Sequence, residues 1–138
     1  IILNEKKFGI EKVKTNKNFK KKIDNLKIKI NLVIKKVNEK GKIVHGYAAS
    51  TKGNVLLQYL KLNDSKIKFI SDRNPKKTNL YTPGSNIRII SETMSRKMKP
   101  DYYLVLAWHF KKEILLREKF IRKKGTKFIF PLPNLEII

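Results

Sequence analysis

The sequence predicts an α/β domain built on one parallel sheet with helices on both faces. Short apolar segments of strand length alternate with amphipathic segments of helical spacing along the 138 residues. One of these segments, residues 102–107, is almost wholly apolar, which is typical of a strand buried on both faces of a sheet. Such alternation favours parallel strands joined by right-handed crossovers. We therefore expect a Rossmann-like sheet of about five strands.

A long helix is predicted to precede this sheet, beginning near Phe19 and ending at Gly41. Apolar residues recur every three or four positions, which places them on one face of a helix, and lysines occupy the other faces. The apolar positions are Phe19, Ile23, Leu26, Ile30, Val33, Ile34 and Val37. Because the chain begins with Ile1 and not Met, we expect residues 1–17 to be a linker from a missing upstream domain. Residues 18–138 would then form the domain.

The remaining elements alternate between strands and helices. The predicted strands are residues 43–47, 67–70, 87–90, 102–107 and 126–130. The predicted helices are residues 51–60, a short helix that opens at Ser91 and stops before Pro100, and residues 109–124. Residues 72–86 are rich in Asp, Asn, Pro and Gly, which is typical of turns. Pro131 and Pro133 are expected to end the last strand.

The charge of the chain raises the question of nucleic-acid binding. Lys and Arg outnumber Asp and Glu by 33 to 11, a net charge of +22. The excess is spread along the chain, with +10 over residues 1–42 and +12 over residues 43–138. Only five of the cations are Arg, the residue best suited to reading bases. Lys, Ile and Asn, whose codons are rich in A and T, make up 58 residues, so genome composition favours a solvated lysine-rich surface over nucleic-acid binding.

Several other classes of protein are not supported. The absence of Cys excludes disulfides, thiolate metal sites and cysteine nucleophiles. Two His are too few for a His-rich metal cluster, so no metal ligands are predicted. No Ser-His-Asp order or carboxylate pair is visible, so no catalytic residues are predicted either. No apolar run approaches the roughly 18 residues of a membrane span and no signal peptide opens the chain, so we expect a cytoplasmic protein.

The predicted topology indicates where a ligand would bind. In open parallel sheets a ligand lies beyond the carboxyl ends of the strands, where the strand order reverses. For the order 3-2-1-4-5, the loops after the first, second and fourth strands should face one another there. The candidate binding residues in these loops are Ser50, Thr51, Lys52, Asn54, Asp72, Arg73, Trp108 and His109.

The first of these loops has the features of a positively charged anion site. Small residues allow the backbone to approach a ligand, and the helix that begins near Thr51 offers free N–H groups. The hydroxyls of Ser50 and Thr51 and the charge of Lys52 would add to a phosphate site. The alternative is that Ser50 or Thr51 only caps the helix and that Lys52 is solvated. The segment matches neither a Walker loop nor G-x-G-x-x-G.

Each candidate residue of the other two loops has more than one possible role. Asp72 stands where nucleotide-binding folds place a ribose-binding carboxylate, or it caps the turn before Pro75. Arg73 could pair with Asp72 or with a phosphate. His109 is a general base, a ligand contact or a structural residue, and Trp108 either stacks on a base or sugar or fills the core.

Four segments in these loops and strands carry a family resemblance. Residues 46–54, 72–87, 99–114 and 125–133 resemble, in order, the motifs GYGAxxKGN, DRNPxK…PG…I, KPDYxLxLxWxxxxEI and GxxFxxPxP. These motifs are typical of the C-terminal domain of S-adenosylmethionine-dependent C-methyltransferases of deoxysugar biosynthesis. The chain departs from the pattern at Ala48, where the family usually has Gly, and at Ala107, where Pro is common.

The resemblance implies a parent enzyme with a small metal-binding region, a central S-adenosylmethionine domain and a C-terminal Rossmann-like domain such as this one. It implies methylation of a carbon of a nucleotide-linked keto-sugar, with a base that removes a proton beside the ketone and an enolate that attacks the activated methyl group. The cofactor site and the base would lie in the central domain. This chain would help to hold the nucleotide-diphosphate sugar through the candidate residues, without transferring a methyl group by itself. The alternatives are a stand-alone binding module of the same fold and, less favoured, a nucleic-acid-binding domain.

Overall fold

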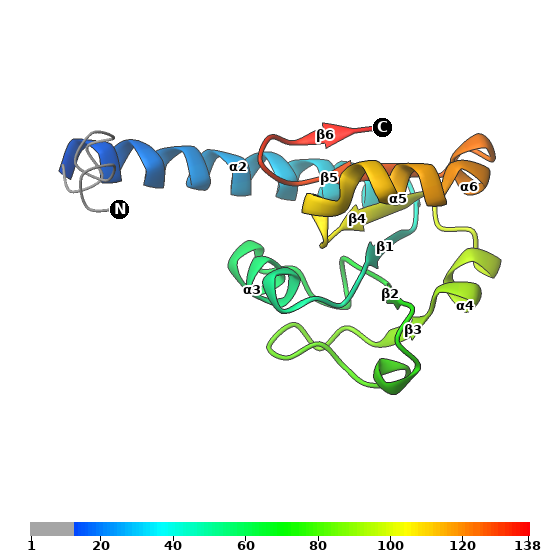
Figure 1. Cartoon of the computed structure of the whole chain (residues 1–138). Coiled ribbons are helices and arrows are strands. Elements are labelled where there is room, and N and C mark those ends of the chain that lie inside the picture. Colours follow the sequence, from blue (N-terminus) through cyan, green and yellow to red (C-terminus); the bar gives the residue numbers. More distant parts are fainter. Residues whose placement is uncertain (1–12) are drawn as a thin grey trace.

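The computed structural model describes residues 13–138, apart from the side chain of Lys14, and its centre is a six-stranded sheet of order β3-β2-β1-β4-β5-β6 (Figure 1). The strands are β1 (Val44–Tyr47), β2 (Ile70–Asp72), β3 (Ile89–Ser91), β4 (Tyr102–Val105), β5 (Lys127–Phe130) and β6 (Glu136–Ile137). The first five pair in parallel, which confirms the predicted parallel sheet, and they have the order 3-2-1-4-5 for which the ligand site was placed. β6 is an unpredicted antiparallel edge strand that forms after the two prolines, where the chain turns back along β5.

Helices cover both faces of the sheet, as predicted. They are α2 (Val13–Glu39), α3 (Thr51–Leu60), α4 (Glu92–Lys97), α5 (Lys111–Arg117) and α6 (Lys119–Lys123), with two 3₁₀ turns, η1 (Pro75–Lys77) and η2 (Trp108–Phe110). Residues of α2 and α3 belong to one buried cluster, whereas residues of α5 and α6 pack on a second cluster. In Figure 1 the first turns of α2 extend beyond the other elements.

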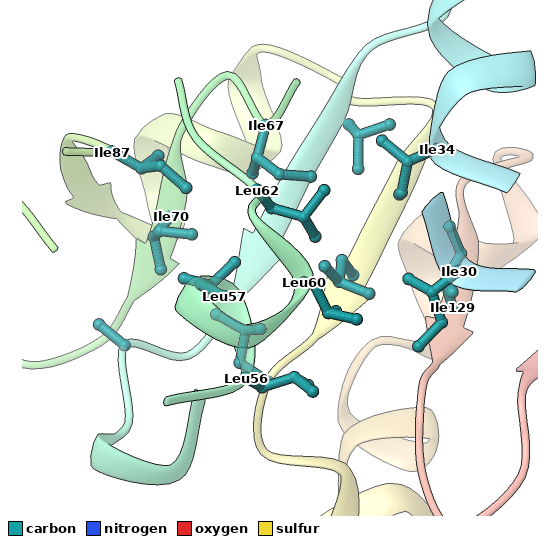
Figure 2. Close-up of a cluster of buried hydrophobic side chains, with 14 of the residues drawn as sticks. Ile30, Ile34, Leu56, Leu57, Leu60, Leu62, Ile67, Ile70, Ile87 and Ile129 are labelled. Atoms are coloured by element: carbon teal, nitrogen blue, oxygen red, sulfur yellow. The ribbon is translucent and has the colours of Figure 1, made fainter. Parts of the chain in front are cut away.

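The two faces of the sheet have different cores. The first core is aliphatic: Ile30 and Ile34 of α2 meet Leu57 and Leu60 of α3 over the sheet, and all four are fully buried (Figure 2). The second core is aromatic, with Tyr47, Tyr103 and Phe128 in contact on neighbouring strands. Side chains of successive strand residues point to opposite faces, so one set of strands supplies both cores.

The second and third strands begin later than the sequence predicts. Ile67 and Ile87 were expected inside strands, but both lie in connecting turns, where the Ile67 N–H donates to the Asn63 carbonyl and the Ile87 N–H donates to the Thr82 hydroxyl. Both isoleucines are fully buried. Their apolar character therefore reflects burial and not strand conformation.

The two long predicted helices also differ from expectation. The segment 109–124 is divided into η2, α5 and α6, with a break at Glu118, whose side chain is drawn into the interior. α2 has already begun at Val13 and runs through the predicted domain boundary at residues 17 and 18, so that division stays a prediction. Phe19 is 65% exposed, and the first fully buried residue on the apolar face of α2 is Ile30. Residues 1–12 of the predicted linker lie outside the described part.

A buried carboxylate, Glu118, joins the helices of the aromatic face to the sheet. The Tyr47 hydroxyl donates to Glu118 Oε1 at 2.7 Å, and Arg96 Nε donates to Oε2 at 3.1 Å. Glu92 in turn contacts the guanidinium groups of both Arg96 and Arg117. Burial alone would raise the pKa of Glu118, but the hydrogen bonds from Arg96 and Tyr47 outweigh burial and lower it. The carboxylate therefore stays charged and holds α4 and α5 against β1.

His45 of β1 lies in the same aromatic core and has a structural environment. Its Nδ1 is 2.8 Å from the Ser95 hydroxyl, which is 2.7 Å from the Tyr103 hydroxyl. Burial lowers the pKa of His45 to about 4, below its ordinary value of 6.5. The imidazole is therefore neutral in the folded protein at neutral pH.

We predict that His45 makes the fold sensitive to mild acid. Below pH 6.5 the unfolded chain binds a proton on this imidazole, whereas the folded chain resists it until about pH 4, so stability falls with pH across that window. Urea unfolding at about pH 7.5 and about pH 4.5 measures the drop, and the imidazole should account for about 2 to 3 kcal/mol of it. His45→Gln should lose that part of the drop. An equal drop in both proteins would contradict the assignment.

The turn after β1 contains a strained residue, Ala48. Its φ of +71° lies in the left-handed region that favours glycine. The Ala48 N–H donates to the Ser71 carbonyl at 2.8 Å, so the backbone is held in this conformation. A glycine would adopt this conformation without steric strain.

We predict that Ala48→Gly stabilises the protein by about 1 kcal/mol, because relief of left-handed strain outweighs the added freedom of the unfolded chain. Thermal or urea unfolding measures this change. The neighbouring Ala49→Gly is the matched control: Ala49 is buried and is not left-handed, so its loss should destabilise the protein. A decrease in stability for both variants would show that Ala48 is not strained.

Candidate functional site

The three predicted loops meet at one pocket of about 440 Å³ at the carboxyl edge of the sheet. This confirms the expected convergence, and the volume is within the usual range for small-molecule sites. The pocket is lined by Tyr47, Ala48, Ser50, Asp72, Arg73, Asn74, Lys77, Glu92, Ala107, Phe110, Glu113, Ile114 and Arg117. A separate cavity of about 500 Å³, here called the amino-edge cavity, lies at the opposite edge, near Lys99 and Thr126.

Asp72 connects two of the loops that form the pocket. Its Oδ2 accepts from the Ala49 N–H at 2.7 Å, and its Oδ1 accepts from the Asn74 N–H at 2.8 Å. Lys77 Nζ lies 3.7 Å from Oδ2 and donates to the Ala49 carbonyl at 2.7 Å. Of the two readings of Asp72, these bonds support the turn cap, because both carboxylate oxygens already serve the backbone.

The start of α3 is arranged as a capped helix. Ser50 Oγ accepts from the Gly53 N–H at 3.0 Å and donates to the Leu106 carbonyl at 3.3 Å. Thr51 and Lys52 are exposed on the first turn and do not line the pocket. Asn54 does not line it either, and its Oδ1 is buried without a hydrogen-bond partner among the described residues. The positive charge expected from Lys52 is therefore outside the pocket.

The residues after β4 divide between core and surface. Trp108 packs against both buried clusters, which supports the core-filling reading. His109 is exposed, and its ring lies 4.4 Å from that of Phe110. Of the eight candidate residues, only Ser50, Asp72 and Arg73 line the pocket, and all eight binding roles stay predictions.

Charges of both signs line the pocket, contrary to the positively charged site that the loop sequence predicts. The cations are Arg73, Lys77 and Arg117, and the carboxylates are Asp72, Glu92 and Glu113. Most of them are paired: Lys77 with Asp72, and Arg117 with Glu92. Tyr47 cannot supply a phenolate, because burial and the Glu118 carboxylate raise its pKa.

Sequence reasoning missed the helical wall of this pocket. Phe110, Glu113 and Arg117 are three and four residues apart, so they share one face of the segment that follows β4. The apolar spacing of this segment predicts Phe110 on the inner face together with Ile114 and Leu115, but Phe110 is 49% exposed and lines the pocket instead. The residues of the neighbouring face, Ile114 and Leu115, do pack on the aromatic core. The rotation of the helix about its axis determines which of the two faces lies against the core and which lines the pocket.

Within residues 13–138, no three His, Asp or Glu side chains are grouped as a metal site requires. In the same part of the chain, no helix combines the length and apolarity needed to cross a bilayer.

Comparison with known proteins gives two matches. A sequence family described as the C-methyltransferase C-terminal domain matches residues 1–133. The chain is also 35% identical over all 138 residues to the C-methyltransferase NovU of Streptomyces niveus. It spans 33% of the length of that relative, or about a third. The chain therefore belongs to the family of C-methyltransferase C-terminal domains.

Proposed function

We propose that this chain is the nucleotide-sugar-binding domain of an S-adenosylmethionine-dependent C-methyltransferase that acts on a nucleotide-linked keto-sugar. The observation that carries the proposal is the carboxyl-edge pocket, in which three loops of a family member converge on polar groups of both signs. Open parallel sheets bind nucleotides at this edge. A nucleotide-diphosphate sugar needs both kinds of polar group, because its phosphates need cations and its hydroxyls need acceptors.

Arg73 is the residue best placed to contact the diphosphate. It lines the pocket, is exposed, and forms no ion pair with any residue in the described part of the chain. Lys77 and Arg117 also line the pocket, but each is engaged by a carboxylate. A guanidinium can bind two phosphate oxygens at once, so an unpaired Arg is well suited to this role.

The described residues do not suit S-adenosylmethionine itself. A Rossmann-like site would hold the ribose of that cofactor with an acidic residue at the end of β2. Here that residue is Asp72, which is 8% exposed and bound to the Ala49 and Asn74 amides. In this proposal another part of the enzyme binds the cofactor, and the isolated chain transfers no methyl group.

Calorimetric titration with thymidine diphosphate tests the proposal. The wild-type chain should bind this ligand, and Arg73→Ala should weaken binding about tenfold or more, since a charge-assisted contact is lost. Lys52→Ala is the matched control, because it removes one positive charge close to the pocket but outside its lining. We expect it to change the affinity by less than about twofold.

Two results would contradict this assignment. An equal loss in Arg73→Ala and Lys52→Ala would place the phosphate at the start of α3 or indicate only general attraction to a basic protein. Absence of thymidine diphosphate binding by the wild-type chain would remove the support for nucleotide binding.

A further inference from the structure

Carboxylates are scarce in this chain but gather at the pocket. The sequence has 11 Asp and Glu against 33 Lys and Arg. Three of the acids, Asp72, Glu92 and Glu113, line the pocket, and Glu118 is buried behind it in contact with Tyr47. A solvated lysine-rich surface does not account for this concentration.

These carboxylates are not equivalent. Asp72 is used by two backbone amides, and Glu92 is held by Arg96 and Arg117. Glu113, on the first turn of α5, is exposed, lines the pocket and makes no hydrogen bond or ion pair with any side chain in residues 13–138. It is therefore the carboxylate in this pocket that is free to accept hydrogen bonds from a ligand.

An aromatic ring lies on the same wall. Phe110 precedes Glu113 by three residues, is 49% exposed and lines the pocket. Ile114, buried in the aromatic core, anchors this segment to the sheet. An apolar ring beside a free carboxylate offers two complementary contacts: a surface for the C–H groups of a sugar ring and acceptors for its hydroxyls.

We propose that Phe110 and Glu113 form the subsite for the sugar ring, while the diphosphate lies toward Arg73 on the β2 loop. This inference rests on the proposed function and adds the orientation of the ligand. A phosphate beside Glu113 would meet a like charge, whereas a neutral hexose with several hydroxyls would not. Glu113 thus selects both the position of the sugar and the direction in which the nucleotide enters.

The test compares thymidine diphosphate with thymidine-diphosphate-glucose on the full chain by calorimetry. Glu113→Gln keeps the size of the side chain but removes its charge and weakens its acceptors. It should leave thymidine diphosphate affinity unchanged or slightly increased, because a nearby negative charge is lost, and should weaken thymidine-diphosphate-glucose about fivefold or more. A loss confined to the sugar-bearing ligand cannot arise from loss of folding or from a change in net charge.

Two further variants sharpen the comparison. Glu39→Gln makes the same chemical change at an exposed position of α2 outside the pocket, and it should alter neither affinity by more than about twofold. Phe110→Leu keeps an apolar side chain without the ring. It should weaken the sugar-bearing ligand more than the diphosphate.

The possible failures are distinguishable. If the wild-type chain binds neither ligand, the proposed function fails and the subsite fails with it. If the wild-type chain binds both ligands, and Glu113→Gln changes both affinities equally or not at all, the subsite is overturned while nucleotide binding stands.

Discussion

The buried Asp72 carboxylate is the contact on which the shape of the candidate site depends. It accepts from the amides of Ala49 and Asn74, which belong to loops that follow different strands. Lys77 partly neutralises the carboxylate, and it also donates a hydrogen bond to the Ala49 carbonyl in the loop after β1. A buried charge is costly without such partners. Because these loops leave the sheet at β1 and β2, a link between them fixes one side of the pocket.

The opposite side of the pocket is fixed by a second charged group on the aromatic face. Glu118 joins Tyr47 of β1 to Arg96 of α4, and Glu92 joins Arg96 to Arg117 of α5. These bonds hold the helical wall that presents Phe110 and Glu113. The chain has three cations for every carboxylate, so partners for arginine are scarce. Glu92 and Glu118 supply the acceptors for this buried hydrogen-bond network, which lysine side chains cannot do.

The sequence was sufficient to predict a parallel sheet with helices on both faces, because alternation of apolar segments and the crossover rule leave few arrangements. It did not predict the antiparallel edge strand β6. The sequence did not predict where β2 and β3 begin. Ile67 and Ile87 lie in turns, but they are buried and are therefore as apolar as strand residues. The sequence predicted which loops form the site but not which of their side chains line it. Lys52 and Arg73 are both exposed cations in those loops, and only the direction of each side chain distinguishes them. That direction depends on where a helix or turn begins, which composition does not reveal.

The central claim is that the carboxyl edge of the sheet binds the ligand. The most direct measurement is the chemical-shift change of backbone amides in the nitrogen-15-labelled chain during titration with thymidine-diphosphate-glucose. The account predicts the largest changes at residues 48–50, 72–74 and 110–113, on all three sides of the pocket. Changes confined to the amino-edge cavity around Lys99 and Thr126, or the absence of any change, would contradict it.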